Sequence, residues 1–575
     1  MNDRVDAIVV GLGAAGAIVA EQLAAAGLEV VGLEKGPHFT AHDFRFKHDE
    51  LRYFTRQALS PHMGTDPLTW RGSEREQAAV LPWAVGAQAI GPLFLPPSSG
   101  SGGGTVHWAA WCWRFRPAEF RMRSAIVERF GKSAIPEDST LVDWPIGYDD
   151  LEPYYDRVEW EQGVSGQAGN VNGELQPGGN PFEAPRRRGY PMPPLRQGAA
   201  SERFAEACGR LGYHPFPAPA GIASEDYDGR SACVYCGFCR DYPCHVDAKT
   251  STQLTSIPRA LASGNFEIRP YARVFRVNRD SSGRATGVAY FDADGTEREL
   301  DAETVVLACY ALENARLLLV SGINENGQVG RHFMTHNYGW FTGTLPEWTN
   351  PFMGPAVACN VIDDITSELV PDNQEGVLWG SPIIGFAGDV QPLEMTLNMP
   401  EDVPTWGRGF KDWLRENYRR TFSMYSQTPT FPSSRFYCDL DPVVTDRFGQ
   451  PALRITHGWV EHDVKAVELI QRIKRTIASE MGMRTFWEAP LEPPYHLSTH
   501  EVGTHRMGED PRASVVDPFG QCHECPGLYA VGGGQFPSYG SYNPTETIMA
   551  LAYWAADHIL EAAGASPSVA AAKRS

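Results

Sequence analysis

The sequence has no excess of positive charge and no hydrophobic run long enough to cross a membrane. Its 575 residues include 50 Lys and Arg against 70 Asp and Glu, a formal net charge of −20. Binding a nucleic acid or an anionic membrane surface needs clustered positive charge, so this composition argues against both. The apolar stretch over residues 7–20 ends at Glu21, short of the ~18 residues of a membrane-spanning helix. We therefore expect no nucleic-acid partner and no direct membrane span.

A signal peptide and a haem-attachment motif are also missing. Met1–Arg4 leads directly into an apolar strand, with no charged region, apolar core and cleavage site before it. This favours a cytoplasmic location. The nearest approach to Cys-x-x-Cys-His begins at Cys522 and ends at Cys525, but Pro526 follows in place of His. We interpret Cys522 and Cys525 as a turn pair that is open to disulfide formation, and any haem as part of another chain.

The first 34 residues have the pattern of a dinucleotide-binding βαβ unit. A strand at residues 6–10 precedes Gly11, Gly13 and Gly16, and an Ala-rich helix leads to a second strand that ends at Glu34. In such a motif the first glycine allows a tight turn, the second admits a pyrophosphate, and the third lets helix and strand pack closely. The carboxylate at the end of the second strand is placed to accept from ribose hydroxyls. The unit predicts dinucleotide binding without separating NAD from FAD.

A second set of candidate residues lies near the carboxyl end. His500 stands in a His-x-x-Gly-Thr segment, and Asn543-Pro544-Thr545 opens a stretch with apolar residues at helical spacing. Pro544 suits the first helical position, and Asn543 with Glu546 resembles a capping box. Free N–H groups at a helix N-terminus stabilise an anion, such as a reduced flavin. From the residues alone, the more frequent interpretation is that His500 is a hydrogen-bonded core histidine and that Asn543 is only a helix cap.

Four of the eleven cysteines, Cys233, Cys236, Cys239 and Cys244, lie within twelve residues. In a chain with a full core this clustering indicates metal binding better than a disulfide framework. The spacing C-x2-C-x2-C-x4-C is close to a ferredoxin run, although the last interval is one residue longer and no proline follows. Four thiolates suit tetrahedral zinc equally well. The residues therefore leave an iron–sulfur cluster and zinc open.

The middle of the chain gives weaker signals. A Gly- and Pro-rich connection at residues 163–195 is long enough to be a surface lid or a subunit contact. Its basic run, Arg186 to Arg188, is expected to be a solvated charge run. Tryptophans such as Trp340, Trp379 and Trp406 can stack on a sugar ring, although single aromatics are more often core.

In their order along the chain, these motifs resemble the glucose-methanol-choline (GMC) family of flavin oxidoreductases. The likeness also includes SGGGTVHW at residues 101–108, Asp143-Trp144-Pro145 with the segment 148–155, and the segment 305–316. The cysteine run and the glycine-rich stretch are most similar to the flavoprotein subunits of gluconate 2-dehydrogenase and its relatives. The resemblance implies FAD rather than NAD.

The resemblance also implies a fold. It is an α/β protein with a Rossmann-like FAD-binding domain and an α+β substrate domain that carries an antiparallel sheet. The FAD-binding domain is expected at residues 1–335 and 498–575, with the cysteine cluster in the loop 233–249. The substrate domain is expected at residues 336–497.

Carried over by resemblance, His500 takes the proton of a substrate hydroxyl and Asn543 orients its oxygen. A near-neutral base is needed because a C–H leaves as hydride only as the hydroxyl proton departs. The implied cofactor-binding residues are Gly11, Gly13, Gly16, Glu34, Gly103, Gly104, His107, Asn543, Pro544 and Thr545. His107 is a candidate for a covalent bond to the flavin; the alternative is that His107 and Trp108 pack over its dimethylbenzene edge.

The resemblance favours an iron–sulfur cluster over zinc, as 3Fe-4S, without fixing which three of the four cysteines bind it or excluding 4Fe-4S. The implied activity is oxidation of a hydroxyl of a sugar, sugar acid or polyol, with electrons leaving through the cluster. The acceptor would be an external haem c or quinone, together with a small chaperone-like subunit. Export to the periplasm bound to a signal-bearing partner is the alternative location. The alternative functions are an oxidase that uses dioxygen with a structural metal site, and an electron-transfer or assembly subunit without substrate chemistry.

Overall fold

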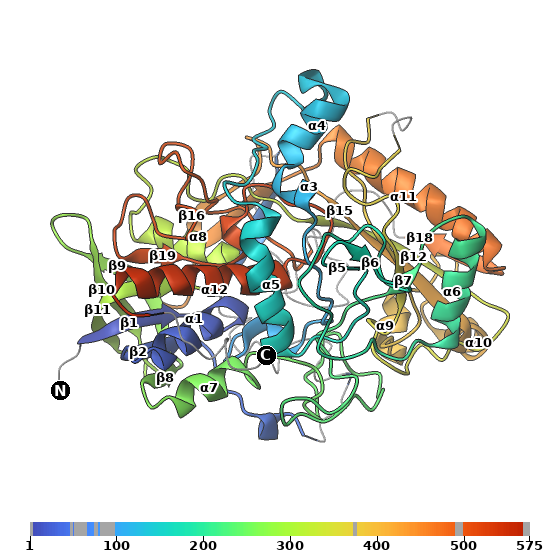
Figure 1. Cartoon of the computed structure of the whole chain (residues 1–575), viewed down its shortest axis with the longest axis horizontal. Helices are drawn as coiled ribbons and strands as arrows, with labels where there is room; N and C mark the ends of the chain where they lie inside the picture. The colour runs from blue at the N-terminus through green and yellow to red at the C-terminus, as the bar shows by residue number, and fades with distance from the viewer. Residues whose placement is uncertain are drawn as a thin grey trace.

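The structure is a computed structural model that describes residues 4–45, 50, 66–73, 79–80, 98–371, 376–488 and 498–566. Two large sheets lie at opposite ends of the molecule, with the helix α5 (Tyr148–Gln162) between them (Figure 1). None of the helices within these ranges combines the length and apolarity that crossing a bilayer requires.

The seven-stranded sheet contains the N-terminal βαβ unit. Its strands are β1 (Arg4–Val10), β2 (Val30–Glu34), β8 (Phe266–Pro270), β9 (Arg273–Arg279), β10 (Ala285–Phe291), β11 (Glu297–Leu307) and β19 (Leu528–Ala530). The order is β8-β2-β1-β11-β10-β9, and β19 pairs with β11. The strands β8, β2, β1, β11 and β19 are parallel neighbours, while β10 and β9 extend the sheet antiparallel. The carboxyl ends of β1, β11 and β19 therefore meet at one edge, where ligands bind in such sheets.

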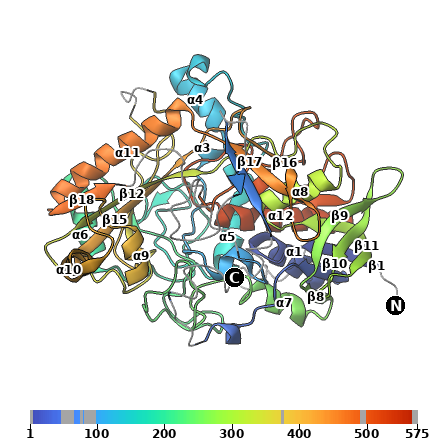
Figure 2. The ribbon, with the colours of Figure 1, turned by 180° about the vertical axis from the view of Figure 1, so that it is seen from behind.

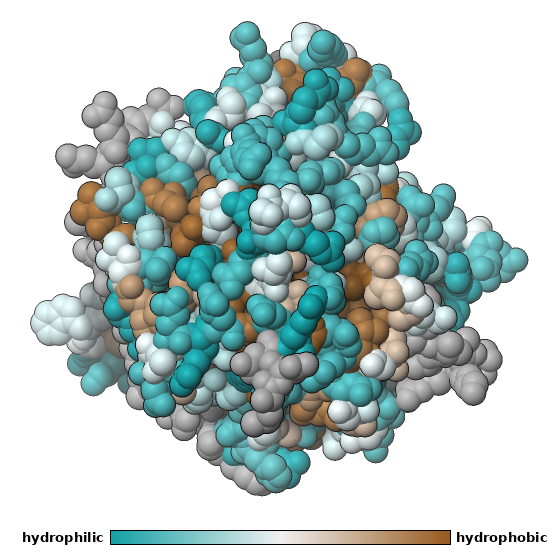
Figure 3. Space-filling view, turned by 90° about the vertical axis from the view of Figure 1, so that its left-hand side faces the viewer, coloured by the Kyte–Doolittle hydropathy of each residue, from teal (hydrophilic) through white to brown (hydrophobic). Residues whose placement is uncertain are grey.

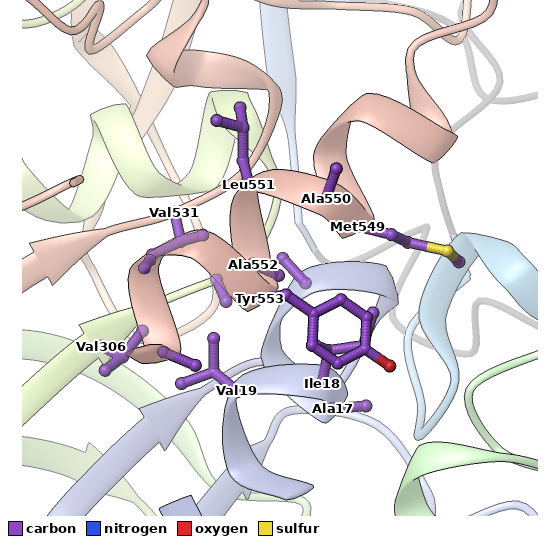
Figure 4. Close-up of a cluster of buried hydrophobic side chains, with 14 of the residues drawn as sticks. Ala17, Ile18, Val19, Val306, Val531, Met549, Ala550, Leu551, Ala552 and Tyr553 are labelled. Carbon is purple, nitrogen blue, oxygen red and sulfur yellow. The ribbon is translucent and has the colours of Figure 1, made fainter. Parts of the chain in front are cut away.

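Two helices from opposite ends of the chain cover this sheet. α1 (Ala14–Ala25) packs against α12 (Thr545–Ala562), and α5 packs on α12 from the other side. Their shared core joins Ile18 and Val19 of α1 to Leu551 and Ala552 of α12 above Val306 of β11 (Figure 4). The outer face at this end is mainly hydrophilic, with separate hydrophobic patches (Figure 3). α1 is buried on all sides from Ala15 to Ala24, and α12 is buried over most of its surface. This burial fixes where both ends of the chain approach the sheet edge.

The six-stranded sheet is antiparallel throughout, in the order β18-β12-β15-β14-β13-β7. Its strands are β7 (Phe216–Pro217), β12 (His336–Thr344), β13 (Asn360–Ile362), β14 (Ile383–Phe386), β15 (Thr421–Pro429) and β18 (Thr485–Glu488). Behind it lies α11 (Glu461–Glu480), whose apolar face packs on β12 and β15 (Figure 2). Every residue of β15 is buried, as expected for a central strand covered on both faces.

The predicted α/β fold class, with a Rossmann-like domain and an antiparallel second sheet, is confirmed. A further sheet of four strands was not anticipated: β16 (Tyr437–Thr445), β17 (Pro451–His457), β3 (Leu68–Gly72) and β4 (Ala79–Val80). The boundary at residues 335/336 stays a prediction. β7 and α6 (Ala199–Arg210) lie before it in sequence, yet β7 pairs with β13 and α6 packs on β13 and β14.

Candidate functional site

A cavity of about 830 Å³ lies where the carboxyl edge of the seven-stranded sheet faces the six-stranded sheet. The glycine loops at residues 11–15 and 103–105 line one side, and Tyr338, Trp340 and Tyr425 line the other. Its size falls in the range of ~300–1,000 Å³ typical of cofactor and small-molecule sites. His500 and Asn543 also line this cavity. The cavity therefore contains both the predicted dinucleotide loops and the predicted catalytic pair.

The two glycine loops lie against each other, and neither Gly11 nor Gly103 has room for a side chain. At Gly11, with φ +86°, a Cβ would stand 2.7 Å from Cα of Cys309. At Gly103, with φ +50°, a Cβ would stand 2.8 Å from Cα of Gly13. Gly16 is outside the cavity lining, and a Cβ there would stand 1.9 Å from the carbonyl oxygen of Gly11. Gly16 thus lets α1 pack against the turn, as predicted for the third glycine of the motif.

The start of α1 has the features of an anion-binding site. Gly13 is its N-cap and contributes no side-chain cap, and the first turn carries no acidic residue. Free N–H groups at such a terminus suit a pyrophosphate. Glu34 lies beside it: its Oε2 accepts from the N–H of Leu12 at 3.1 Å and its Oε1 from that of Gly36 at 2.9 Å. Each carboxylate oxygen retains a second acceptor position, so the residues present fit the diphosphate and ribose of FAD.

His107 lies where the glycine loop passes the cavity. Its Nε2 accepts from the N–H of Ser98 at 3.1 Å, and its side chain lines the cavity. Trp108 also lines the cavity, and its indole N–H donates to the carbonyl of Thr250 at 2.9 Å. This placement is compatible with both interpretations of His107, so covalent attachment stays a prediction.

His500 and Asn543 are in direct contact. The Nδ2 of Asn543 lies 3.2 Å from the Nε2 of His500. Burial lowers the pKa of His500 to about 3, so the imidazole is neutral at physiological pH and keeps a lone pair. The structure therefore brings together the two residues predicted to act on the substrate hydroxyl.

The orientation of the Asn543 carboxamide is fixed by two buried donors. Its Oδ1 accepts from the indole N–H of Trp113 at 2.8 Å and from the Nε2 of Gln427 at 2.8 Å. With its oxygen occupied, the amide turns its N–H group to His500. The predicted helix cap is wrong: α12 begins at Thr545 after Pro544, and no side chain caps it. Pro544 and Thr545 line the cavity at this helix start.

The four clustered cysteines lie on one loop beside the cavity. Within the ranges that the structure describes, no three Cys, His, Asp or Glu side chains are arranged as metal ligands. Burial raises the pKa of Cys233 to about 11 and holds that of Cys239 well above its usual value. A metal would therefore have to displace thiol protons on binding. The four thiols have the right chemistry to bind a metal as thiolates. The loop does not, however, place their sulfur atoms around a common centre.

Buried polar groups anchor this cysteine loop to the cavity wall. The Nζ of Lys249 donates to the carbonyls of Trp108 at 2.9 Å, Cys239 at 2.5 Å and Tyr242 at 2.7 Å. The carboxylate of Asp389 accepts from the N–H of Cys239 at 2.9 Å. The next residue, Arg240, lines the cavity and pairs with Glu394. Sequence reasoning missed this anchor, because nothing about the spacing of an isolated lysine marks it.

The tryptophans differ in position. Trp340 lines the cavity beside Tyr425, with ring centroids 5.1 Å apart. Trp379 is buried in a separate core cluster, and Trp406 is 82% exposed outside the lining. Of these three tryptophans, Trp340 alone lines the cavity and is placed to stack on a substrate.

Two other expectations, from the middle and the end of the chain, hold in part. Arg186 is buried and bonded to Glu159 and Glu183, so it is not a solvated charge, whereas the side chain of Arg187 is exposed as expected. Cys522 and Cys525 flank a turn, with the N–H of Cys525 3.3 Å from the carbonyl of Cys522, but both thiols are free.

Comparison with known proteins gives concordant matches. Two family models described as GMC oxidoreductase match residues 143–338 and 432–552. The gluconate 2-dehydrogenase flavoprotein of Pantoea cypripedii is 32% identical, over 97% of this chain and 94% of that protein. The 2-methyl-1,2-propanediol dehydrogenase of Mycolicibacterium austroafricanum is 27% identical, over 97% and 95%. The fold is similar to that of formate oxidase from Aspergillus oryzae, with a TM-score of 0.62, 16% identity, and coverage of 97% and 98%.

Proposed function

The chain belongs to the GMC oxidoreductase family of flavoprotein dehydrogenases and oxidases that act on alcohol-type substrates, and we propose that it is an FAD-dependent dehydrogenase of a sugar, sugar acid or polyol. The observation that carries this proposal is the contact between His500 and Asn543 at the wall of the cavity that the glycine loops also line. A base and an amide donor at one point are what removal of an alcohol proton requires.

The chemistry follows from these side chains. The Nε2 of His500 carries the lone pair that takes the hydroxyl proton, and the Nδ2 of Asn543 donates to the hydroxyl oxygen and holds it beside the base. FAD, when bound, supplies the hydride acceptor. Trp113 and Gln427 keep the amide of Asn543 from rotating, because a rotated amide would place its N–H group against two donors. The orientation of the amide is thus fixed before substrate enters, and the substrate hydroxyl takes the place of the contact between Nδ2 of Asn543 and Nε2 of His500.

The substrate class is supported by the opposite wall of the cavity. Trp340 and Tyr425 present aromatic rings, and Arg240 and Glu394 add polar groups. Aromatic faces with nearby hydrogen-bonding groups suit a polyhydroxylated ring or chain. The similarity to a gluconate 2-dehydrogenase flavoprotein supports the same class.

We further propose that the loop 233–249 binds an iron–sulfur cluster, with 3Fe-4S favoured, that passes electrons to an external haem c or quinone. The support is the density of thiols on a loop that borders the cavity through Arg240 and Asp241. The same proposal includes a small chaperone-like partner subunit. We propose a cytoplasmic location, with export to the periplasm bound to a signal-bearing partner as the alternative. Iron and acid-labile sulfide per flavin, measured in anaerobically purified protein, test it; absence of both would refute it.

The test of the activity is anaerobic flavin bleaching with a panel of neutral sugars, sugar acids and polyols. The reduced protein is then mixed with an artificial acceptor or with oxygen. We expect bleaching by at least one member of the panel and fast reoxidation by the artificial acceptor only. Rapid peroxide formation in oxygen would instead identify an oxidase. A His500→Ala variant should retain FAD, and its rate of flavin reduction should be lower by a factor of about 10² to 10⁴, the range for loss of a general base. An unchanged rate of flavin reduction would disprove the assignment of His500 as the base.

A further inference from the structure

We propose that His336, which sequence reasoning did not single out, is a positioning residue that holds His500 in the one tautomer able to act as base at Nε2. The inference rests on the proposed function, because it concerns the same base. His336 is the first residue of β12 and is fully buried. It is absent from the described cavity lining, so it would act through His500.

The tautomer follows from a chain of hydrogen bonds. The Nε2 of His336 lies 2.7 Å from the carbonyl oxygen of Gly540. A carbonyl only accepts, so this nitrogen carries a proton. Burial keeps His336 neutral, with its pKa well below the usual value. Its Nδ1 therefore has no proton and can only accept.

The next bond in the chain fixes His500. The two Nδ1 atoms of His336 and His500 lie 2.9 Å apart. Because the Nδ1 of His336 accepts, the Nδ1 of His500 must donate. The lone pair of neutral His500 is then on Nε2, the atom that faces Asn543. Gly540, two imidazoles and the amide thus form one ordered series in which only one tautomer satisfies every bond.

The relative position of the two rings is also fixed. The Oγ of Ser498 accepts hydrogen bonds from two backbone N–H groups, that of His500 at 2.9 Å and that of His336 at 3.3 Å. The ring of Tyr539 stacks on His336 with centroids 4.1 Å apart. Longer contacts, from the hydroxyls of Tyr338 to His500 at 3.5 Å and of Tyr539 to His336 at 3.4 Å, compete only weakly. The 2.9 Å bond is therefore the main constraint on the tautomer.

This arrangement differs from one in which a carboxylate orients the base. A neutral acceptor sets the tautomer and receives the N–H bond of the imidazolium, but adds no negative charge to raise the pKa of His500. In the step itself, the O–H bond of the substrate breaks and a new N–H bond forms at Nε2 of His500. The proton on Nδ1 stays on His500, and His336 neither gains nor loses one.

The ionisable groups around the two rings are few. Tyr338, Tyr425 and Tyr539 surround them from β12, β15 and the segment before α12, each with its pKa raised by burial. Glu501 follows His500 and accepts from the hydroxyl of Tyr310. Glu119 packs on the backbone of Gly540, and burial raises its pKa to about 8. A shift in the acidic limb of the pH profile on changing His336 would therefore report on the imidazole pair, because Glu119 titrates well above that limb.

Three variants test the proposal. His336→Asn keeps an acceptor near the position of Nδ1, whereas His336→Gln keeps only a donor near the position of Nε2. His462→Asn is the control, since His462 is a buried imidazole whose Nδ1 accepts a backbone N–H from Leu378 and which is absent from the described cavity lining. We expect His336→Gln to lower kcat/KM by about 10- to 100-fold, the effect of removing an orienting partner. The acidic limb of kcat/KM in His336→Gln should move to lower pH, because the imidazolium form of His500 has lost the acceptor at Nδ1 of His336. His336→Asn should recover most of the rate and the wild-type limb.

A second readout does not depend on turnover. In protein labelled with ¹⁵N-histidine, wild type should show His500 with a bare Nε2 and a protonated Nδ1, assigned by comparison with His500→Asn. His336→Gln should show a mixture of tautomers. Equal losses in His336→Asn and His336→Gln with an unmoved pH limb and an unchanged tautomer would overturn the inference. Because the base assignment is tested separately by His500→Ala, a slow His500→Ala with a normal His336→Gln would reject the positioning role alone.

Discussion

The substitution Asn543→Asp tests the geometry of the site most directly, because it changes one atom facing His500 and keeps the shape of the side chain. The oxygens of Asp still accept from Trp113 and Gln427. The N–H group 3.2 Å from Nε2 of His500 becomes a carboxylate oxygen, which faces a lone pair unless His500 is protonated. An opposite charge at this range raises an imidazole pKa by about 1 to 3 units. The acidic limb of kcat/KM should therefore move up by about 1 to 3 pH units.

The assay is the pH dependence of flavin reduction from pH 3, where the pKa of His500 places the wild-type limb, to pH 9, with Asn543→Ala as the matched variant. Asn543→Ala leaves the N–H groups of Trp113 and Gln427 without an acceptor, at about 1 to 3 kcal/mol each. It should thus lower the free energy of unfolding while leaving the acidic limb of His500 unraised. If Asn543→Asp keeps the wild-type limb and plateau, the amide does not face the base in the working enzyme, and the argument fails.

Three further outcomes follow from packing and charge. Gly103→Ala would set a Cβ 2.8 Å from Gly13 at φ +50°, so the purified protein should lose most of its flavin absorbance, whereas Gly198→Ala, in open space, should keep it. Lys249→Met removes the donor that three carbonyls share, and each carbonyl left without a donor lowers the free energy of unfolding by at most about 1 to 3 kcal/mol. The thermal midpoint and the iron content per flavin should both fall. An unchanged iron content would show that Lys249 does not support metal binding by the cysteine loop. Burial raises the pKa of Asp463 to about 8, above its value in the unfolded chain. Its contribution to the free energy of unfolding is therefore complete at low pH and is lost as the pH rises toward 8, by up to about 1.4 kcal/mol per pH unit. Asp463→Asn should flatten this pH dependence in denaturation experiments at pH 5 to 8, and an unchanged slope would contradict the prediction.

Features that depend on near neighbours in the sequence were predictable. The strand, glycine turn and helix of residues 6–25 were expected from hydrophobic periodicity, and the structure gives β1 and α1 within two residues of that expectation. The stretch with apolar residues at helical spacing that opens at Asn543-Pro544-Thr545 is α12 at Thr545–Ala562. The pattern suffices there because buried faces recur at fixed intervals. Charge runs are different. The burial of Arg186 depends on Glu159, which lies 27 residues away in the chain, and the residues next to Arg186 in the sequence do not predict this pairing.

The site itself shows why local patterns are insufficient. Asn543 before Pro544 and three residues ahead of Glu546 is compatible with both a helix cap and a catalytic amide. The choice between them is made by Trp113 and Gln427, which lie 430 and 116 residues away in the chain and occupy its oxygen. A cap would need that same oxygen for an N–H of α12, and an amide oxygen already accepting two bonds has no remaining position for it. Because Trp113 and Gln427 occupy the oxygen that a helix cap would need, the fold leaves the Nδ2 group of Asn543 to contact His500. In the same way, the tautomer of His500 is determined by His336, which lies 164 residues away in the chain.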